Sequence, residues 1–163
     1  MDVKDFIKHF INNEYCEDIG LDEYLEDAEF RESMYKELHN NLELIHSNLL
    51  RKMLIIEIDQ RKNDIIGDLY ENLYWCAFLI YRIRDVNDVD ILWIAKNTDF
   101  DTYCAFDIQF LIGAGLENTI EYLSGKSDVN SQKALDYILS CKDAGDFDDM
   151  ENWYDGKFEY YNR

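Results

Sequence analysis

Apolar residues recur at spacings of three and four along most of the chain, the pattern of helices that bury one face. The longest such pattern covers residues 30–61, and we expect it to break near 39–41 or 59–63. Its stripe consists of Leu38, Leu42, Ile45, Leu49, Met53 and Ile56. Because no β-branched run with a period of two is present, the pattern predicts an all-α fold.

Capping residues and glycines divide the rest of the chain into shorter predicted helices. Asp2, Asp88, and either Asp99 or Asp101 are candidate N-caps, and Gly145 is a candidate helix stop. The predicted helices span 3–13, 21–28, 64–83, 89–96, 100–112 and 116–123. One more opens at Asp128 or Ser131, and the last is capped by Asp146, with a break or bend at Asp155–Gly156.

The stretch from Tyr103 to Ile112 contains only two polar residues, Asp107 and Gln109. A helix that is apolar nearly all round is buried, so we expect this helix to be the centre of the fold. The run 72–81 is also apolar on most sides and should be central. Asp107 is then a structural buried acid, which needs a basic partner such as Lys96, Arg82 or Arg84.

The length of 163 residues fits one domain over 1–163. The absence of proline, the seven glycines and the 47% apolar composition favour helices around a full core. From Asp88 onward, short and longer helices alternate in the manner of a HEAT-like α-solenoid. A compact helical bundle is the alternative architecture.

The chain carries 35 acidic and 16 basic residues, a net charge of −19. This charge disfavours nucleic acid and anionic membranes and suits a basic protein partner, although it also serves solubility. The four cysteines are widely spaced and show no metal-binding pattern, which indicates a reducing, cytoplasmic location. The longest uncharged apolar run is too short to cross a bilayer.

Recognised catalytic and cofactor motifs are absent, so we predict a protein that is not an enzyme and that uses no cofactor or metal. His39, Glu43 and His46 could share a helix face, but a solvated face is the better interpretation than a metal site. The acids after Asp85 do not fit a calcium loop, since the required glycine and glutamate are missing.

Two acidic clusters are the candidate partner-binding residues. The first, here called the acidic rim, lies around the central stretch, and five acids there exceed what helix capping needs. The second combines acids with aromatic residues, which commonly anchor interfaces. The rim comprises Asp85, Asp88, Asp90, Asp99 and Asp101, and the second cluster includes Asp148, Asp149, Trp153 and Tyr154.

The segment LWIAKNTDFDTYCAFDIQFLIGAG, within an acidic chain that is predicted to be all-helical, resembles the immunity proteins of bacterial polymorphic and contact-dependent toxin systems. The likeness covers about residues 69–153. It implies a cytoplasmic protein without catalysis that binds a cognate toxin, often a basic nuclease, and blocks its active site. It also implies that Asp88, Asp90, Asp99, Asp101 and Asp107 serve partner binding or architecture.

The function expected from the sequence is therefore inhibition of a basic protein such as a toxin nuclease. A helical scaffold or regulatory module without an inhibitory role is the first alternative. The second alternative is a helical enzyme that uses Asp107 together with Lys96 or an arginine.

Overall fold

The computed structural model describes residues 1–12, 19–63 and 69–162, and within these ranges it contains helices and no strand. The predicted all-α fold is confirmed, while the likeness to HEAT repeats stays a prediction. The first half of the chain forms α1 (Val3–Asn12), α2 (Ile19–Glu26), α3 (Ala28–Asn41), η1 (Leu44–His46) and α4 (Ser47–Lys62). The predicted start of a helix at Asp64 lies outside the described residues.

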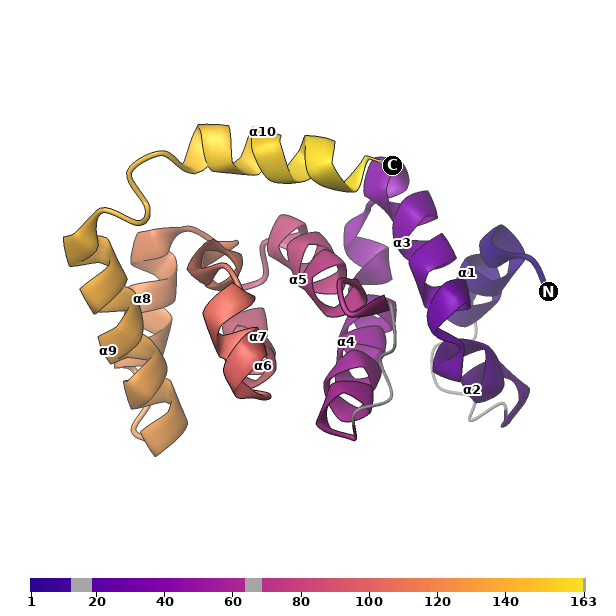
Figure 1. Cartoon of the computed structure of the whole chain (residues 1–163), viewed down its shortest axis with the longest axis horizontal. Coiled ribbons are helices and arrows are strands. Elements are labelled where there is room, and N and C mark those ends of the chain that lie inside the picture. Colours follow the sequence, from indigo (N-terminus) through magenta and orange to yellow (C-terminus); the bar gives the residue numbers. More distant parts are fainter. Residues whose placement is uncertain (13–18, 64–68, 163) are drawn as a thin grey trace.

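The second half begins with α5 (Asn72–Ile83), η3 (Val86–Asp88), α6 (Val89–Lys96) and α7 (Phe100–Ala105). It continues through η4 (Ile108–Ile112), α8 (Leu116–Ser124), α9 (Val129–Ala144) and α10 (Met150–Tyr161). Helices α1 to α9 follow one another from right to left across the view, and α10 runs back above them and returns the chain toward α3 (Figure 1). The last helix therefore closes over elements that precede it by many residues.

Helix α5 is the centre of the core. From Trp75 to Ile80, every side chain is at most 2% exposed, as the apolar run predicts. Helix α4 packs along α5. The ring of Trp75 stacks on Tyr161 of α10, and the ring of Phe78 contacts the same tyrosine at a tilt. A helix buried on nearly all sides must be covered by neighbours on every face, and α10 supplies the cover on one of them.

The predicted continuous helix over 100–112 is wrong. Helix α7 ends at Ala105, Phe106 and Asp107 are extended, and η4 follows as a 3₁₀ helix. The buried ammonium of Lys96 binds the carbonyl oxygens of Tyr103 and Phe106 at 2.7 and 2.9 Å. These carbonyls at the end of α7 lack helical partners, so Lys96 satisfies them and stabilises the break.

Two glycine positions have a clear structural cause. At Gly113 a Cβ atom would lie 2.3 Å from the carbonyl oxygen of Tyr81, so only glycine allows this approach to α5. Gly145 ends α9 in the left-handed region with φ of 86°, as the sequence predicts. The backbone N–H of Asp146 donates to Cys141 in this termination, so Asp146 helps to close α9.

The predictions for the last helix need two corrections. Asp146 does not cap it, because α10 begins four residues later, after Asp149. No break occurs at Asp155–Gly156, since Gly156 lies within the helix with no atom near its missing Cβ. Asp2, Asp99 and Asp128 do accept hydrogen bonds from the first turns of their helices.

Candidate partner-binding surface

Asp85 and Asp88 of the acidic rim bind one arginine of α4. The Arg51 guanidinium donates to Asp88 at 2.6 Å through Nε and to Asp85 at 2.8 Å through Nη2. Burial raises the pKa of Asp88, against the opposing effect of Arg51. Hydrogen bonds from Asn87, aided by Arg51, lower the pKa of Asp85. Asp88 was predicted as a helix cap, but its side chain makes no capping hydrogen bond.

Asp90 and Asp99 also have basic partners within the chain. Asp90 binds the ammonium of Lys126 and accepts a 2.8 Å hydrogen bond from the Tyr122 hydroxyl. Asp99 caps α7 and pairs with Arg61 at 3.1 Å. Asp101 is exposed, and it alone of the five rim acids has no basic partner in the described ranges. Four of the five rim acids therefore have a structural role, and their contact with a partner stays a prediction.

These ion pairs connect elements that are not consecutive along the chain. Arg51 and Arg61 join α4 to the residues that begin η3 and α7, and Lys126 joins the end of α8 to α6. The partners are separated by 34 to 38 residues. Lys96 is the single base between Asp85 and Asp107 in the sequence, and the basic partners of the rim acids are not evident there because only tertiary packing brings them together.

The second cluster divides between two faces of α10. Trp153 and Tyr154 face the core and are partly buried. Trp153 packs edge-on against Tyr81, with the ring centroids 5.1 Å apart. The ring of Tyr154 packs against that of Phe78, with a centroid distance of 5.7 Å. These two aromatic residues therefore hold α10 in place across α5, and their predicted role as partner anchors stays untested.

An acidic stripe, defined as Asp148, Glu151, Asp155 and Glu159, runs from the turn before α10 along the side of the helix away from these aromatic residues. Glu151, Asp155 and Glu159 follow at intervals of four residues and share one helix face, Asp148 lies in the turn just before the helix, and all four are exposed. In the described residues, none of them forms an ion pair. Asp149, predicted in one cluster with Asp148, accepts a 2.9 Å hydrogen bond from the Asn152 side chain at the start of the helix.

Asp107 is not the predicted buried acid. Its side chain is 26% exposed, and it pairs with Lys157 of α10 at 2.8 Å. It also accepts a 2.8 Å hydrogen bond from the indole Nε1 of Trp153. Asp107 thus fastens α10 to the start of η4. Neither Lys96 nor the predicted arginines forms a hydrogen bond or ion pair with it in the described residues.

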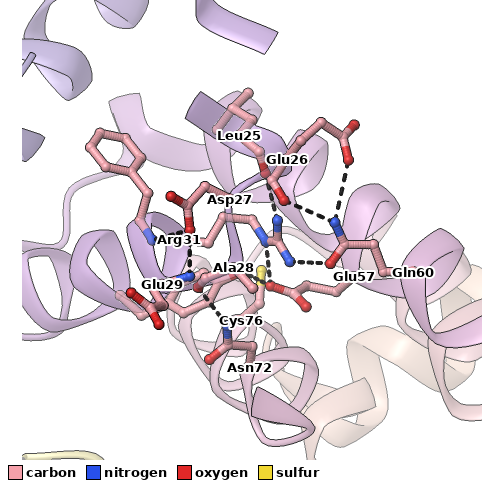
Figure 2. A network of polar contacts seen from close by, with 12 residues as sticks. Leu25, Glu26, Asp27, Ala28, Glu29, Arg31, Glu57, Gln60, Asn72 and Cys76 are labelled. Carbon is pink, nitrogen blue, oxygen red and sulfur yellow. Dashed lines mark hydrogen bonds and ion pairs between the residues drawn. The ribbon is translucent and has the colours of Figure 1, made fainter. Parts of the chain in front are cut away.

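The buried ion pair lies elsewhere, between Arg31 of α3 and Glu57 of α4. Figure 2 shows Arg31 donating to Glu57, to Gln60 and to the backbone oxygen of Leu25, each at 2.6 Å. Tyr35 donates to the same Glu57 oxygen at 2.8 Å. Burial lowers the pKa of Arg31, but the hydrogen bond and charge of Glu57 outweigh it and raise the pKa overall. This network is closed and satisfied, which marks it as structural.

The histidines do not form the predicted solvated face. His39 and His46 are 1% and 8% exposed, and the His46 Nδ1 accepts a hydrogen bond from the backbone of Glu43. Burial lowers the pKa of both histidines, and the nearby charge of Arg82 lowers that of His39 further. No group of three metal-binding side chains is found in the part of the chain that the structure describes.

Comparison with known proteins finds no family model that matches the chain, and no significant match to a curated protein or a solved structure. The resemblance to immunity proteins thus gains no support from relatives. No helix in the described ranges is both long and apolar enough to cross a membrane.

Proposed function

We propose that this protein binds a basic protein through the acidic stripe of α10 and inhibits it, in the manner of an immunity protein that neutralises a bacterial toxin. The observation that carries the proposal is the distribution of unpaired charge. The rim acids mostly bind bases of the same chain, whereas the stripe acids bind none in the described residues. A nuclease suits the role because its nucleic-acid site must be basic.

The like charges of the acidic stripe destabilise the helix that carries them. Glu151, Asp155 and Glu159 follow at intervals of four residues, and like charges at this spacing destabilise a helix by about 0.2–0.5 kcal/mol per pair. The inner face of α10 compensates through the Asp107–Lys157 pair and the aromatic contacts. A rigidly held helix with one acidic face provides a fixed set of charges for steering a basic partner.

The proposal is tested by affinity capture with matched baits, followed by an inhibition assay. The stripe variant Asp148→Asn/Glu151→Gln/Asp155→Asn removes three charges. The control Glu23→Gln/Glu29→Gln/Asp59→Asn removes three exposed charges from α2, α3 and α4. We expect a basic protein to be retained by the unmodified and control baits, to be lost with the stripe variant, and to lose activity when bound.

Capture of the same proteins by both variants would refute the role of the stripe. A captured partner that stays fully active would refute inhibition while leaving binding intact.

A further inference from the structure

Two adjoining hollows form one groove beside the C-terminal end of α5. Leu44, Ile83 and Arg84 line both of them, so the hollows meet at these residues. The larger has a volume of about 690 Å³ and extends over Val86 and Ala114 toward α8, and the smaller has about 300 Å³. A volume of this order accommodates a short peptide segment.

Arg84 is the unusual residue of this groove. Each of the four other arginines in the described ranges donates a side-chain hydrogen bond, while Arg84 donates none. Its neighbour Arg82 donates to the carbonyl of His39 at 2.7 Å and lies over the Phe158 ring. In a chain with 35 acids, an exposed guanidinium without an internal partner is available to an external carboxylate.

The backbone of Arg84 is also unusual. It has φ of 64° and ψ of 28°, the left-handed conformation that helix ends normally give to glycine. It is the single non-glycine residue with positive φ in the described ranges. An L-residue in this region costs about 1–2 kcal/mol, so an arginine here is tolerated against a conformational penalty.

The remaining lining of the groove defines its preference. Leu44 is 69% exposed and, with Val86 and Ala114, offers an apolar surface. Asp85 is bound by Arg51, but Glu121 in the larger hollow and Glu43 in the smaller one form no ion pair in the described ranges and add negative charge. A polyanion would therefore be repelled in both hollows.

We propose that this groove binds a short segment of a partner protein that presents one acidic side chain beside an apolar side chain. Arg84 takes the carboxylate in a charge-assisted pair, and Leu44 with Val86 takes the apolar group. The groove shares no residue with the acidic stripe, and it binds its ligand through a positive charge and not through negative ones. This proposal therefore does not depend on the proposed function. It would give specificity that a purely acidic surface cannot supply.

The test is a titration of isotope-labelled protein followed by amide NMR signals. The probes are two peptides, acetyl-Leu-Glu-amide and acetyl-Leu-Gln-amide, and inorganic phosphate. We expect saturable shifts at Arg84, Ala114 and Asn118 with the Glu peptide and about tenfold weaker binding of the Gln peptide. Arg84→Gln should abolish this preference, and the control Lys133→Gln, which removes a charge from α9, should keep it.

Equal binding of both peptides, or an unchanged preference in Arg84→Gln, would overturn the proposal. So would shifts confined to other residues, or no saturable shift at about 10 mM peptide. Phosphate binding as strong as that of the Glu peptide would show a general anion site and would also overturn it.

Discussion

Removal of Glu57 should destabilise this protein far more than removal of Asp107, although both are acids paired with a base. Arg31 is fully buried and Glu57 is 2% exposed. Glu57→Ala would leave a buried guanidinium without its counter-charge, which costs about 3–5 kcal/mol. It would also deprive the Tyr35 hydroxyl of its acceptor. For a domain of this size each kcal/mol shifts the melting temperature by about 2–4 °C, so a fall of about 6–20 °C is expected.

The Asp107–Lys157 pair provides the comparison. Its side chains are 26% and 28% exposed, so water screens and resolvates the charge that remains. Asp107→Ala should therefore cost about 1–2 kcal/mol, including the lost hydrogen bond to Trp153. Glu57→Gln keeps an acceptor for the Tyr35 hydroxyl, so its loss of stability should lie between the losses of Glu57→Ala and Asp107→Ala.

Urea unfolding at pH 7, followed by tryptophan fluorescence, measures these differences, and circular dichroism checks that each variant keeps its helices. Equal losses for Glu57→Ala and Asp107→Ala would refute the reasoning that burial decides the cost. A Glu57→Ala variant as stable as the unmodified protein would show that Arg31 finds another partner or reaches water.

Three further predictions concern the histidines, Arg84 and the glycines. The lowered pKa of His39 and His46 means that the folded state favours the neutral rings, so stability present above pH 6.5 should be lost as the pH falls toward 5. Thermal melts at pH 7.5 and 5.5 should show this loss, and an undiminished loss in His39→Gln would exclude His39 as its source. Arg84→Gly should raise the free energy of unfolding by about 0.5–1 kcal/mol by relieving the left-handed strain, and a decrease would show that the conformation is not strained. Gly113→Ala should prevent stable folding because its Cβ would meet the Tyr81 carbonyl, whereas Gly156→Ala, in open space within α10, should stabilise by about 0.5–1 kcal/mol. Thermal melts of the two glycine variants measure this difference, and similar melting temperatures for Gly113→Ala and Gly156→Ala would contradict the packing described.

The sequence predicted most helix boundaries because capping and apolar spacing are local properties. The limits of α6 match the prediction at both ends, and Asp99, Asp128 and Gly145 act where their residue types suggested. The break at Phe106–Asp107 was missed because the apolar pattern continues through it. Its cause, the Lys96 ammonium bound to two carbonyls, arises only when α6 packs on α7.

The candidate site was harder to predict for the same reason. Charge density identified the acidic rim, but Arg51, Arg61 and Lys126 come from distant positions and bind most of its acids. The helical spacing of Glu151 and Asp155 was available in the sequence. Its meaning depended on which face of α10 the aromatic residues bury, and that was known only once α10 was seen across α5 (Figure 1).

The central claim is that the acidic stripe of α10 steers a basic partner, and association kinetics test it most directly. With the captured partner, the rate constant is measured at about 20 and 200 mM salt for the unmodified protein, the stripe variant and the charge-matched control variant. At low salt, the stripe variant should associate about tenfold more slowly than the unmodified protein, and the control variant should be slowed much less. The higher salt concentration should reduce the difference between the two variants. Equal slowing by both triple variants, or an association rate independent of salt, would contradict the claim.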